Sequence, residues 1–362
     1  MTAVMTGRER VARAIERRYP DCIPVLHKIQ DGALHEHGEA LYRLAARCPA
    51  DNEDLTAASR PIPRPDPKHF VNGAYRNTYV DQWGVTWEQC TYGIMGHVVH
   101  YLVQEPDDIK KVCLPDTPAP GSTAARNWAE SVATHQARGF YSLQGWITLF
   151  ETLHSLRRMD DLLMDIVEDN ALANDLTDLV MGVRSRQIEF LLDAGVDGIQ
   201  LADDWGSQQA TLISRPLWQH FFKPRYRRLA QQVRERGKHV FFHSCGHTLP
   251  FFDDLAEIGV QVIWPQAAAN APDEMAAAIR RTGLTLEWDI DRQHTMSHGM
   301  PEDVAAAVAA ARRRFYDAAG GLIFWGELFP GYPQANVEAL FDSLQRQRFP
   351  EDQKPSQTRD EP

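Results

Sequence analysis

Short apolar runs alternate with amphipathic stretches along most of this chain, and this rhythm limits its fold more than any other feature. Seven runs predict strands, at residues 23–28, 140–145, 198–203, 240–243, 260–265, 284–290 and 322–326. Helical periodicity fills the intervals at 149–164, 171–194, 215–236, 248–258, 272–281 and 301–319. Such alternation predicts an α/β fold with parallel strands, and seven to eight units in this length favour a (β/α)₈ TIM barrel. An open doubly wound sheet is the alternative.

One segment interrupts the rhythm and predicts a different local structure. Residues from about 50 to 120 contain four closely spaced prolines at 61, 63, 65 and 67, followed by alternating patterns around 79–87 and 97–103. We interpret this segment as an antiparallel insertion that caps one end of the barrel. The remainder predicts a single barrel domain over residues 1–348, with a polar, aperiodic tail at 349–362 that we expect to be disordered.

Charge and apolar content exclude several classes of partner. The 362 residues include 38 Lys and Arg against 49 Asp and Glu, which gives a formal charge of −11 and disfavours nucleic acid as a partner. Apolar runs are far shorter than the roughly 20 residues of a membrane span, so we expect no membrane partner. The first residues contain no secretory signal and the five cysteines are scattered, so we expect a cytoplasmic location and reduced thiols.

A histidine and a cysteine follow the apolar run 240–242, and they are the strongest chemical signal in the sequence. His243 and Cys245 are two positions apart, so in an extended chain their side chains point to the same face. Imidazole and thiolate are both zinc ligands. The pair therefore predicts part of a metal site at a strand end, whereas a buried cysteine beside a hydrogen-bonded histidine is the structural alternative.

A third metal ligand must come from another strand end. Glu327 is the best candidate, because it follows Gly326 and the apolar run 322–325. Glu287 is a second candidate ligand and is also predicted to be catalytic, and His247 is a weaker third candidate. Each acid can instead pair with an arginine or face solvent.

Further polar and aromatic residues at strand ends are candidates for catalysis or substrate binding. Asp203 and Asp204 follow the run 199–202, and since adjacent side chains point to different sides, at most one of them is expected to face the centre. A helix cap or loop anchor is the alternative role for either aspartate. The predicted substrate-binding residues are Trp205, Gln208, Trp288, Asp289 and Trp325. Tryptophans at strand ends would suit an apolar or planar ligand, although core packing explains each one equally well.

Several motifs together resemble the uroporphyrinogen decarboxylase-like superfamily. They are Gly195-Val196-Asp197-Gly198-Ile199, Asp203-Asp204-Trp205-Gly206, Trp218-x-x-Phe221-Phe222-Lys223-Pro224-Arg225-Tyr226, Phe242-His243-Ser244-Cys245-Gly246 and Phe150-Glu151-x-Leu153. The resemblance extends from about residue 6 to about residue 344. It implies a (β/α)₈ barrel, in agreement with the strand pattern.

This superfamily contains porphyrinogen decarboxylases that need no cofactor and zinc methyltransferases that transfer methyl groups between corrinoid proteins and thiols or other acceptors. The arginine-rich motif of the decarboxylases has no counterpart at residues 24–30, whereas the His-x-Cys pair of the methyltransferases is present. Glu327 stands where these methyltransferases carry their third cysteine. The resemblance thus implies a methyltransferase with zinc held by His243, Cys245 and Glu327, acting on a small methyl donor or acceptor and a corrinoid carried by a partner protein.

Two other functions remain open at this point. One is a metal-independent lyase of the decarboxylase type, in which an aspartate near the barrel axis stabilises a developing cation. The other is a non-catalytic protein that binds a tetrapyrrole or corrinoid through its aromatic residues.

Overall fold

The computed structural model describes residues 5–56 and 60–349. Its contacts divide the chain into two compact units. The first unit comprises Met1–Pro63, Gly139–Tyr141 and Thr285–Pro362, and the second comprises Arg64–Arg138 and Ser142–Leu284. Among the residues that were placed, no helix is both long and apolar enough to cross a bilayer.

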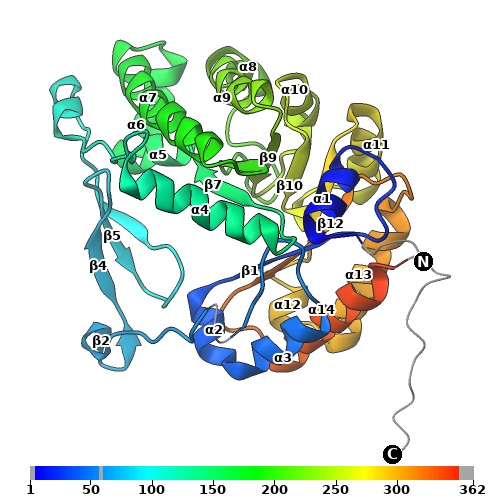
Figure 1. Ribbon diagram of the computed structural model, residues 1–362. Coiled ribbons are helices and arrows are strands. Elements are labelled where there is room, and N and C mark those ends of the chain that lie inside the picture. Colours follow the sequence, from blue (N-terminus) through cyan, green and yellow to red (C-terminus); the bar gives the residue numbers. More distant parts are fainter. Residues whose placement is uncertain (1–4, 57–59, 350–362) are drawn as a thin grey trace, which may run out of the picture. The chain divides into compact units, whose positions relative to one another are not determined.

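Three parallel strands form the sheet of the first unit, in the order β1 (Val25–Ile29), β12 (Leu322–Leu328) and β11 (Thr285–Asp289). Every residue of β12 and β11 is buried, as expected for parallel strands covered on both faces. The helices of this unit are α1 (Gly7–Ile15), α2 (Asp31–His37), α3 (Glu39–Arg47), α12 (Thr295–His298), α13 (Pro301–Phe315) and α14 (Gln334–Gln347). In Figure 1 this unit takes the blue and the orange to red colours, because it joins the two ends of the described chain.

Four parallel strands form the main sheet of the second unit, in the order β10 (Val262–Pro265), β9 (His239–Ser244), β8 (Gly198–Ala202) and β7 (Leu143–Ile147). The accompanying helices are α4 (Thr123–Ala137), α5 (Phe150–Leu156), α6 (Met159–Val167), α7 (Ala171–Asp193), α8 (Arg215–Phe221), α9 (Lys223–Glu235), α10 (Phe252–Glu257) and α11 (Pro272–Thr282). Short 3₁₀ turns η3 (Leu249–Phe251) and η4 (Ala267–Ala269) follow β9 and β10. The α7 helix packs on α9 beside these strands (Figure 1).

The predicted antiparallel insertion is confirmed within the second unit. Strands β4 (Asn77–Val80), β5 (Thr86–Gln89) and β6 (His97–His100) form a three-stranded antiparallel sheet, and β2 (Phe70–Val71) pairs with β3 (Ala74–Tyr75). Two 3₁₀ turns, η1 (Pro67–His69) and η2 (Pro106–Lys111), flank them. The capping role of this insertion stays a prediction.

All seven predicted strands are confirmed as parallel strands, and the α/β character of the fold is therefore established. The barrel needs eight strands, whereas seven parallel strands occur among residues 5–56 and 60–349, so its closure stays a prediction. The single-domain prediction for 1–348 also stays a prediction. Of the tail predicted to be disordered, residues 350–362 lie outside the described residues.

Two predicted helices are each divided in the structure. The stretch 149–164 becomes α5 and α6, because Arg157 takes an extended conformation between them. The stretch 215–236 becomes α8 and α9, which meet at Phe222. Pro224 lies in the first turn of α9, where its missing N–H costs nothing, and it favours a new helix start over continuation of α8.

Candidate functional site

The loops that follow β8 and β9 lie against each other and, with the end of β9, carry about half of the predicted site residues. The backbone N–H of Asp203 donates to the carbonyl of His243 at 3.1 Å, and that of Gly206 donates to the carbonyl of Cys245 at 3.2 Å. A Cβ added to Gly246 would lie 2.0 Å from the carbonyl oxygen of Gly206, and φ of Gly246 is +78°. Only glycine fits so close a backbone approach, so this pair of glycines lets the two strand ends meet.

His243, Cys245 and Asp204 form a compact cluster at this meeting point. One ligand atom from each residue lies within 4.8 Å of the others. The Cys245 Sγ atom is 3.3 Å from His243 Nε2, and Asp204 Oδ1 is 3.7 Å from the same nitrogen. The backbone N–H of Cys245 donates to Asp204 Oδ1 at 2.8 Å, which holds the carboxylate in place. His243 is buried, whereas the Asp204 side chain is 42% exposed, so the cluster is open to solvent on the aspartate side.

The orientation of the His243 ring is fixed from its other side. Nδ1 lies 3.0 Å from the backbone carbonyl oxygen of Trp264. A carbonyl can only accept, so Nδ1 carries the hydrogen and Nε2 of the neutral ring presents its lone pair toward the cluster. The rings of Trp264 and Trp146 pack on the imidazole, with centroid separations of 3.9 and 5.3 Å. This environment holds the ring in the orientation that a metal ligand requires.

The donor set of this cluster fits zinc. Thiolate, imidazole and carboxylate are its three usual protein ligands, and three of them in a site open to solvent leave a position for a substrate atom. Asp204 is the carboxylate that the second unit brings to the His243 and Cys245 pair, whereas the sequence analysis selected Asp204 only as a catalytic candidate. The predicted third ligand, Glu327, belongs to the first unit and is described with it below.

Asp203 points away from this cluster and into a buried network. It is fully buried and accepts hydrogen bonds from the backbone N–H of Leu149 at 2.8 Å and of Glu151 at 2.6 Å, and from the hydroxyl of Tyr226. Burial raises the pKa of Asp203, and these hydrogen bonds oppose the shift. In the structure Asp203 therefore joins β8 to the start of α5 and to α9.

Glu151 is a titratable group of this region that the sequence analysis did not select as a site residue. Burial, together with the neighbouring Asp203 and Asp204 carboxylates, raises the pKa of Glu151, whereas the Arg184 guanidinium lowers it. The residue does occur in the Phe150-Glu151-x-Leu153 motif of the family resemblance. That motif, rather than its position at a helix start, was the signal that could have identified it.

Two of the predicted substrate-binding residues lie on the same loops. Gln208 is exposed and exchanges hydrogen bonds with Gln266 at 3.1 and 3.2 Å, and Gln266 also accepts from the backbone N–H of Gly246. Trp205 is buried and stacks on Phe150 with a centroid separation of 4.3 Å. Gln208 is thus accessible to a ligand, whereas Trp205 packs in an aromatic core, and substrate binding by either residue stays a prediction.

His247 lies in the second unit outside the cluster, with Nδ1 3.2 Å from the carbonyl oxygen of Ala269, and the other remaining predicted residues lie in the first unit. Glu287 and Asp289 share one face of β11, and Glu327 lies in register with Lys28 across β12 and β1. Glu327 is buried and accepts a hydrogen bond from Gln30 at 2.9 Å. Its oxygens also lie 3.5 Å from Lys28 Nζ and 3.5 Å from Arg292 Nη1.

Glu287 is the most isolated of these acids. It is fully buried, and neither carboxylate oxygen has a hydrogen-bond partner among the described residues. Burial raises the pKa of Glu287 well above its usual value, and the Asp289 and Glu327 carboxylates raise it further. Trp288 and Trp325, the other predicted residues of this unit, are both buried.

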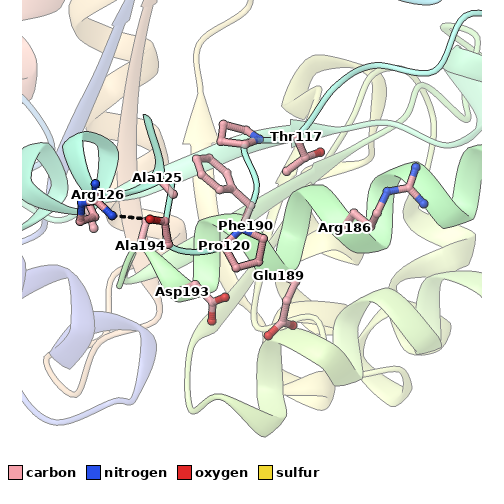
Figure 2. Close-up of a pocket in the computed structure, with 12 residues that line it drawn as sticks. Thr117, Pro120, Ala125, Arg126, Arg186, Glu189, Phe190, Asp193 and Ala194 are labelled. Carbon is pink, nitrogen blue, oxygen red and sulfur yellow. Dashed lines mark hydrogen bonds between the residues drawn. The ribbon is translucent and has the colours of Figure 1, made fainter. Parts of the chain in front are cut away.

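The second unit also contains a cavity of about 370 Å³ that includes none of the predicted site residues. Figure 2 shows it between α4 and α7, with Phe190 and Pro120 among its apolar lining residues. Arg126 at its edge donates to the carbonyl of Gly121. The cavity is therefore separate, in its lining residues, from the His243 cluster.

The family model described as Uroporphyrinogen decarboxylase (URO-D) matches residues 98–347. No curated protein matches the sequence. Among solved structures, a methyltransferase from Methanosarcina mazei superposes with a TM-score of 0.65 at 15% identity, over 94% of this chain and 98% of that chain. This likeness shows a shared fold.

Two other solved structures superpose less well. An endo-β-1,4-xylanase from Gloeophyllum trabeum gives a TM-score of 0.40 at 12% identity, over 63% of this chain and 82% of that chain. A 3-keto-D-glucoside 4-epimerase from E. coli gives a TM-score of 0.35 at 15% identity, over 63% of this chain and 95% of that chain.

Proposed function

Because the chain belongs to the uroporphyrinogen decarboxylase family, we propose that it is a zinc-dependent methyltransferase of that family. It would move a methyl group between a small methylated substrate or thiol and a corrinoid held by a partner protein. The observation that carries this proposal is the convergence of a thiol, an imidazole and a carboxylate at the ends of β8 and β9. The shared fold with a methyltransferase is consistent with it.

The proposed zinc ligands are Cys245 Sγ, His243 Nε2 and a carboxylate, for which Asp204 is the candidate in the same cluster. When bound, zinc would supply Lewis acidity at the substrate heteroatom and favour its deprotonated or leaving form. The hydrogen bond of His243 to the Trp264 carbonyl keeps Nε2 directed at the site, and the N–H of Cys245 keeps the Asp204 carboxylate beside it. These two contacts position the ligands before any substrate arrives.

Substrate specificity would depend on the residues around the open side of the cluster. Gln208 is exposed on the loop after β8 and can donate or accept hydrogen bonds. The fully buried Asp203 would not contact substrate. It would position Asp204, because it anchors the loop that carries both aspartates. This assignment separates the roles of the two adjacent aspartates.

Metal analysis together with a methyl-transfer assay tests the proposal. Purified protein should contain zinc at the cluster of His243, Cys245 and Asp204. Enzyme-dependent methyl transfer should occur from free methylcobalamin to a small thiol, or from small methylated amines and ethers to cob(I)alamin. Cys245→Ser should lose the zinc of this cluster and methyl transfer, because a serine hydroxyl stays protonated where a thiol is deprotonated by the metal. Cys113→Ser, at an exposed cysteine, is the matched control and should keep both.

A wild-type protein that binds no zinc at this cluster and is active without metal would overturn the proposal. In that case the lyase of the decarboxylase type becomes the better function. The specific observation in its favour is the set of buried carboxylates in the first unit, Glu287, Asp289 and Glu327, with Lys28 and Arg292 beside them. Release of carbon dioxide from a porphyrinogen, unaffected by chelators, would identify that activity.

A further inference from the structure

A second thiol, imidazole and carboxylate lie together on the antiparallel sheet of the second unit, in residues that the proposed function does not use. One ligand atom each from Glu88, Cys90 and His97 lies within 4.8 Å of the others. Glu88 belongs to β5, Cys90 directly follows it, and His97 begins β6. Glu88 is partly buried, whereas Cys90 and His97 are exposed.

The strand geometry explains why these three side chains meet. Glu88 and His97 are partners in the antiparallel register of β5 and β6, so their side chains stand on the same face at neighbouring positions. Cys90 lies in a bend directly after β5, and this bend keeps its sulfur within 4.8 Å of the ligand atoms of Glu88 and His97. Strand pairing thus brings Glu88 and His97 together, and the bend after β5 adds Cys90 to them.

The contacts that these residues make without a metal are weak. Arg76 Nη1 lies 3.0 Å from Glu88 Oε1, with side chains 59% and 24% exposed. His97 Nε2 lies 3.5 Å from Glu88 Oε2. An exposed ion pair of this kind contributes roughly 0–1 kcal/mol, so a cation with stronger ligand bonds can displace Arg76.

The sheet itself has little apolar core to hold it. No residue of β4, β5 or β6 is buried, and the burial in this region comes from neighbours such as Trp83 and Val85. Small domains with little apolar core are commonly reinforced by disulfides or metal ions, and the strands of this sheet have the same shortage of buried side chains. A cross-link between β5 and β6 would therefore stabilise an otherwise weakly packed element.

We propose that Glu88, Cys90 and His97 form a second zinc site, which links β5 to β6 and is independent of the His243 cluster. Thiolate and imidazole select a borderline-soft cation such as Zn²⁺ over Mg²⁺ or Ca²⁺, which prefer oxygen ligands. Three protein ligands leave one tetrahedral position for water. We assign this site a structural role, because its ligands would join β5 to β6 in a sheet whose strands contain no buried residue.

Zinc stoichiometry in the full-length protein tests this site. Wild type should bind two equivalents, whereas Cys90→Ser and His97→Gln should each bind one with high affinity. Loss of an outer-shell partner already costs roughly 10–100-fold in metal affinity, so loss of a ligand should weaken the second site by about 100-fold or more. Cys113→Ser, at the other exposed cysteine of this unit, should keep two equivalents. If Cys90→Ser binds as much zinc as wild type does, the proposal is overturned.

A measurement on wild type makes the test independent of how the variants fold. Zinc should slow alkylation of Cys90 relative to Cys113, as measured by peptide mass spectrometry after reaction with iodoacetamide, because a metal-bound thiolate is shielded. Equal alkylation of Cys90 with and without zinc would also overturn the proposal. The two zinc sites can be told apart, because loss of zinc in Cys245→Ser alone reports on the His243 cluster and loss in Cys90→Ser alone reports on the sheet.

Discussion

The Sγ atom of Cys245 lies 3.3 Å from Nε2 of His243, two residues earlier at the end of β9. The i and i+2 spacing of an extended chain places both side chains on one face, and the hydrogen bond from His243 Nδ1 to the Trp264 carbonyl selects the rotation that directs Nε2 toward the sulfur. The relationship therefore depends on β10 as well as on β9, and it explains why a short sequence pattern becomes a pair of ligands.

The third zinc ligand can be identified by matched carboxylate-to-amide changes. We expect Asp204→Asn to lower zinc affinity by about tenfold or more, because the amide keeps the size of the side chain and removes its charge. Glu327→Gln applies the same change to the ligand predicted from sequence, and Asp253→Asn applies it to an exposed acid as a control. Competition with a chromogenic chelator measures each affinity. Unchanged affinity in Asp204→Asn with a loss in Glu327→Gln would restore the sequence-based ligand set.

The contact between Gly206 and Gly246 should be required for the site. We expect Gly246→Ala to destabilise the protein strongly and to weaken zinc binding, because the new Cβ would lie 2.0 Å from a backbone oxygen and φ is +78°. Gly283→Ala is the matched control, since φ there is +75° and nothing lies within 4 Å of the added carbon. Gly283→Ala should lower the free energy of unfolding by only the roughly 1–2 kcal/mol that an alanine loses in the left-handed backbone conformation. Urea unfolding compares the two, and equal effects would contradict the steric explanation.

The sequence predicted the strands well because their signal is local. Apolar runs such as 240–242 and 322–325 are bounded by glycine or polar residues, and parallel strands buried on both faces need such runs. The division between α8 and α9 was not predicted, because Pro224 is compatible with a helix start and the amphipathic pattern continues across it. Helix boundaries of this kind depend more on tertiary packing than on the hydrophobic periodicity of the sequence.

The site was predicted only as far as side-chain direction follows from one strand. Sequence reasoning indicated that Asp203 and Asp204 point to different sides, but it could not say which faces the metal ligands. The structure separates them through partners distant in sequence, since Tyr226 and the N–H of Leu149 hold Asp203, and the N–H of Cys245 holds Asp204. Such long-range hydrogen bonds have no local sequence signal.

The hydroxyl of Tyr226 should contribute measurably to stability. Tyr226→Phe removes its hydrogen bond to the fully buried Asp203 and leaves a carboxylate oxygen with fewer donors. We expect a loss of about 1–3 kcal/mol in the free energy of unfolding. Tyr316→Phe removes the same group from a partly exposed side chain and should change stability little. Urea denaturation of both variants measures the difference, and equal stabilities would refute the role of this bond.

His27 should make the stability of the protein fall in acid. Burial lowers the pKa of His27 from 6.5 to about 4, the nearby Arg348 adds to this, and the Asp51 carboxylate and the Cys48 carbonyl oppose it. The unfolded chain therefore takes up a proton that the folded protein resists, so this contribution is complete above pH 6.5 and is lost as the pH falls toward 4. The loss should reach about 3 kcal/mol. Urea unfolding from pH 7 to 4 should show wild type losing more stability than His27→Gln, whereas the same substitution at the exposed His35 should leave the slope unchanged. Parallel pH profiles for wild type and His27→Gln would show that His27 does not titrate in this way.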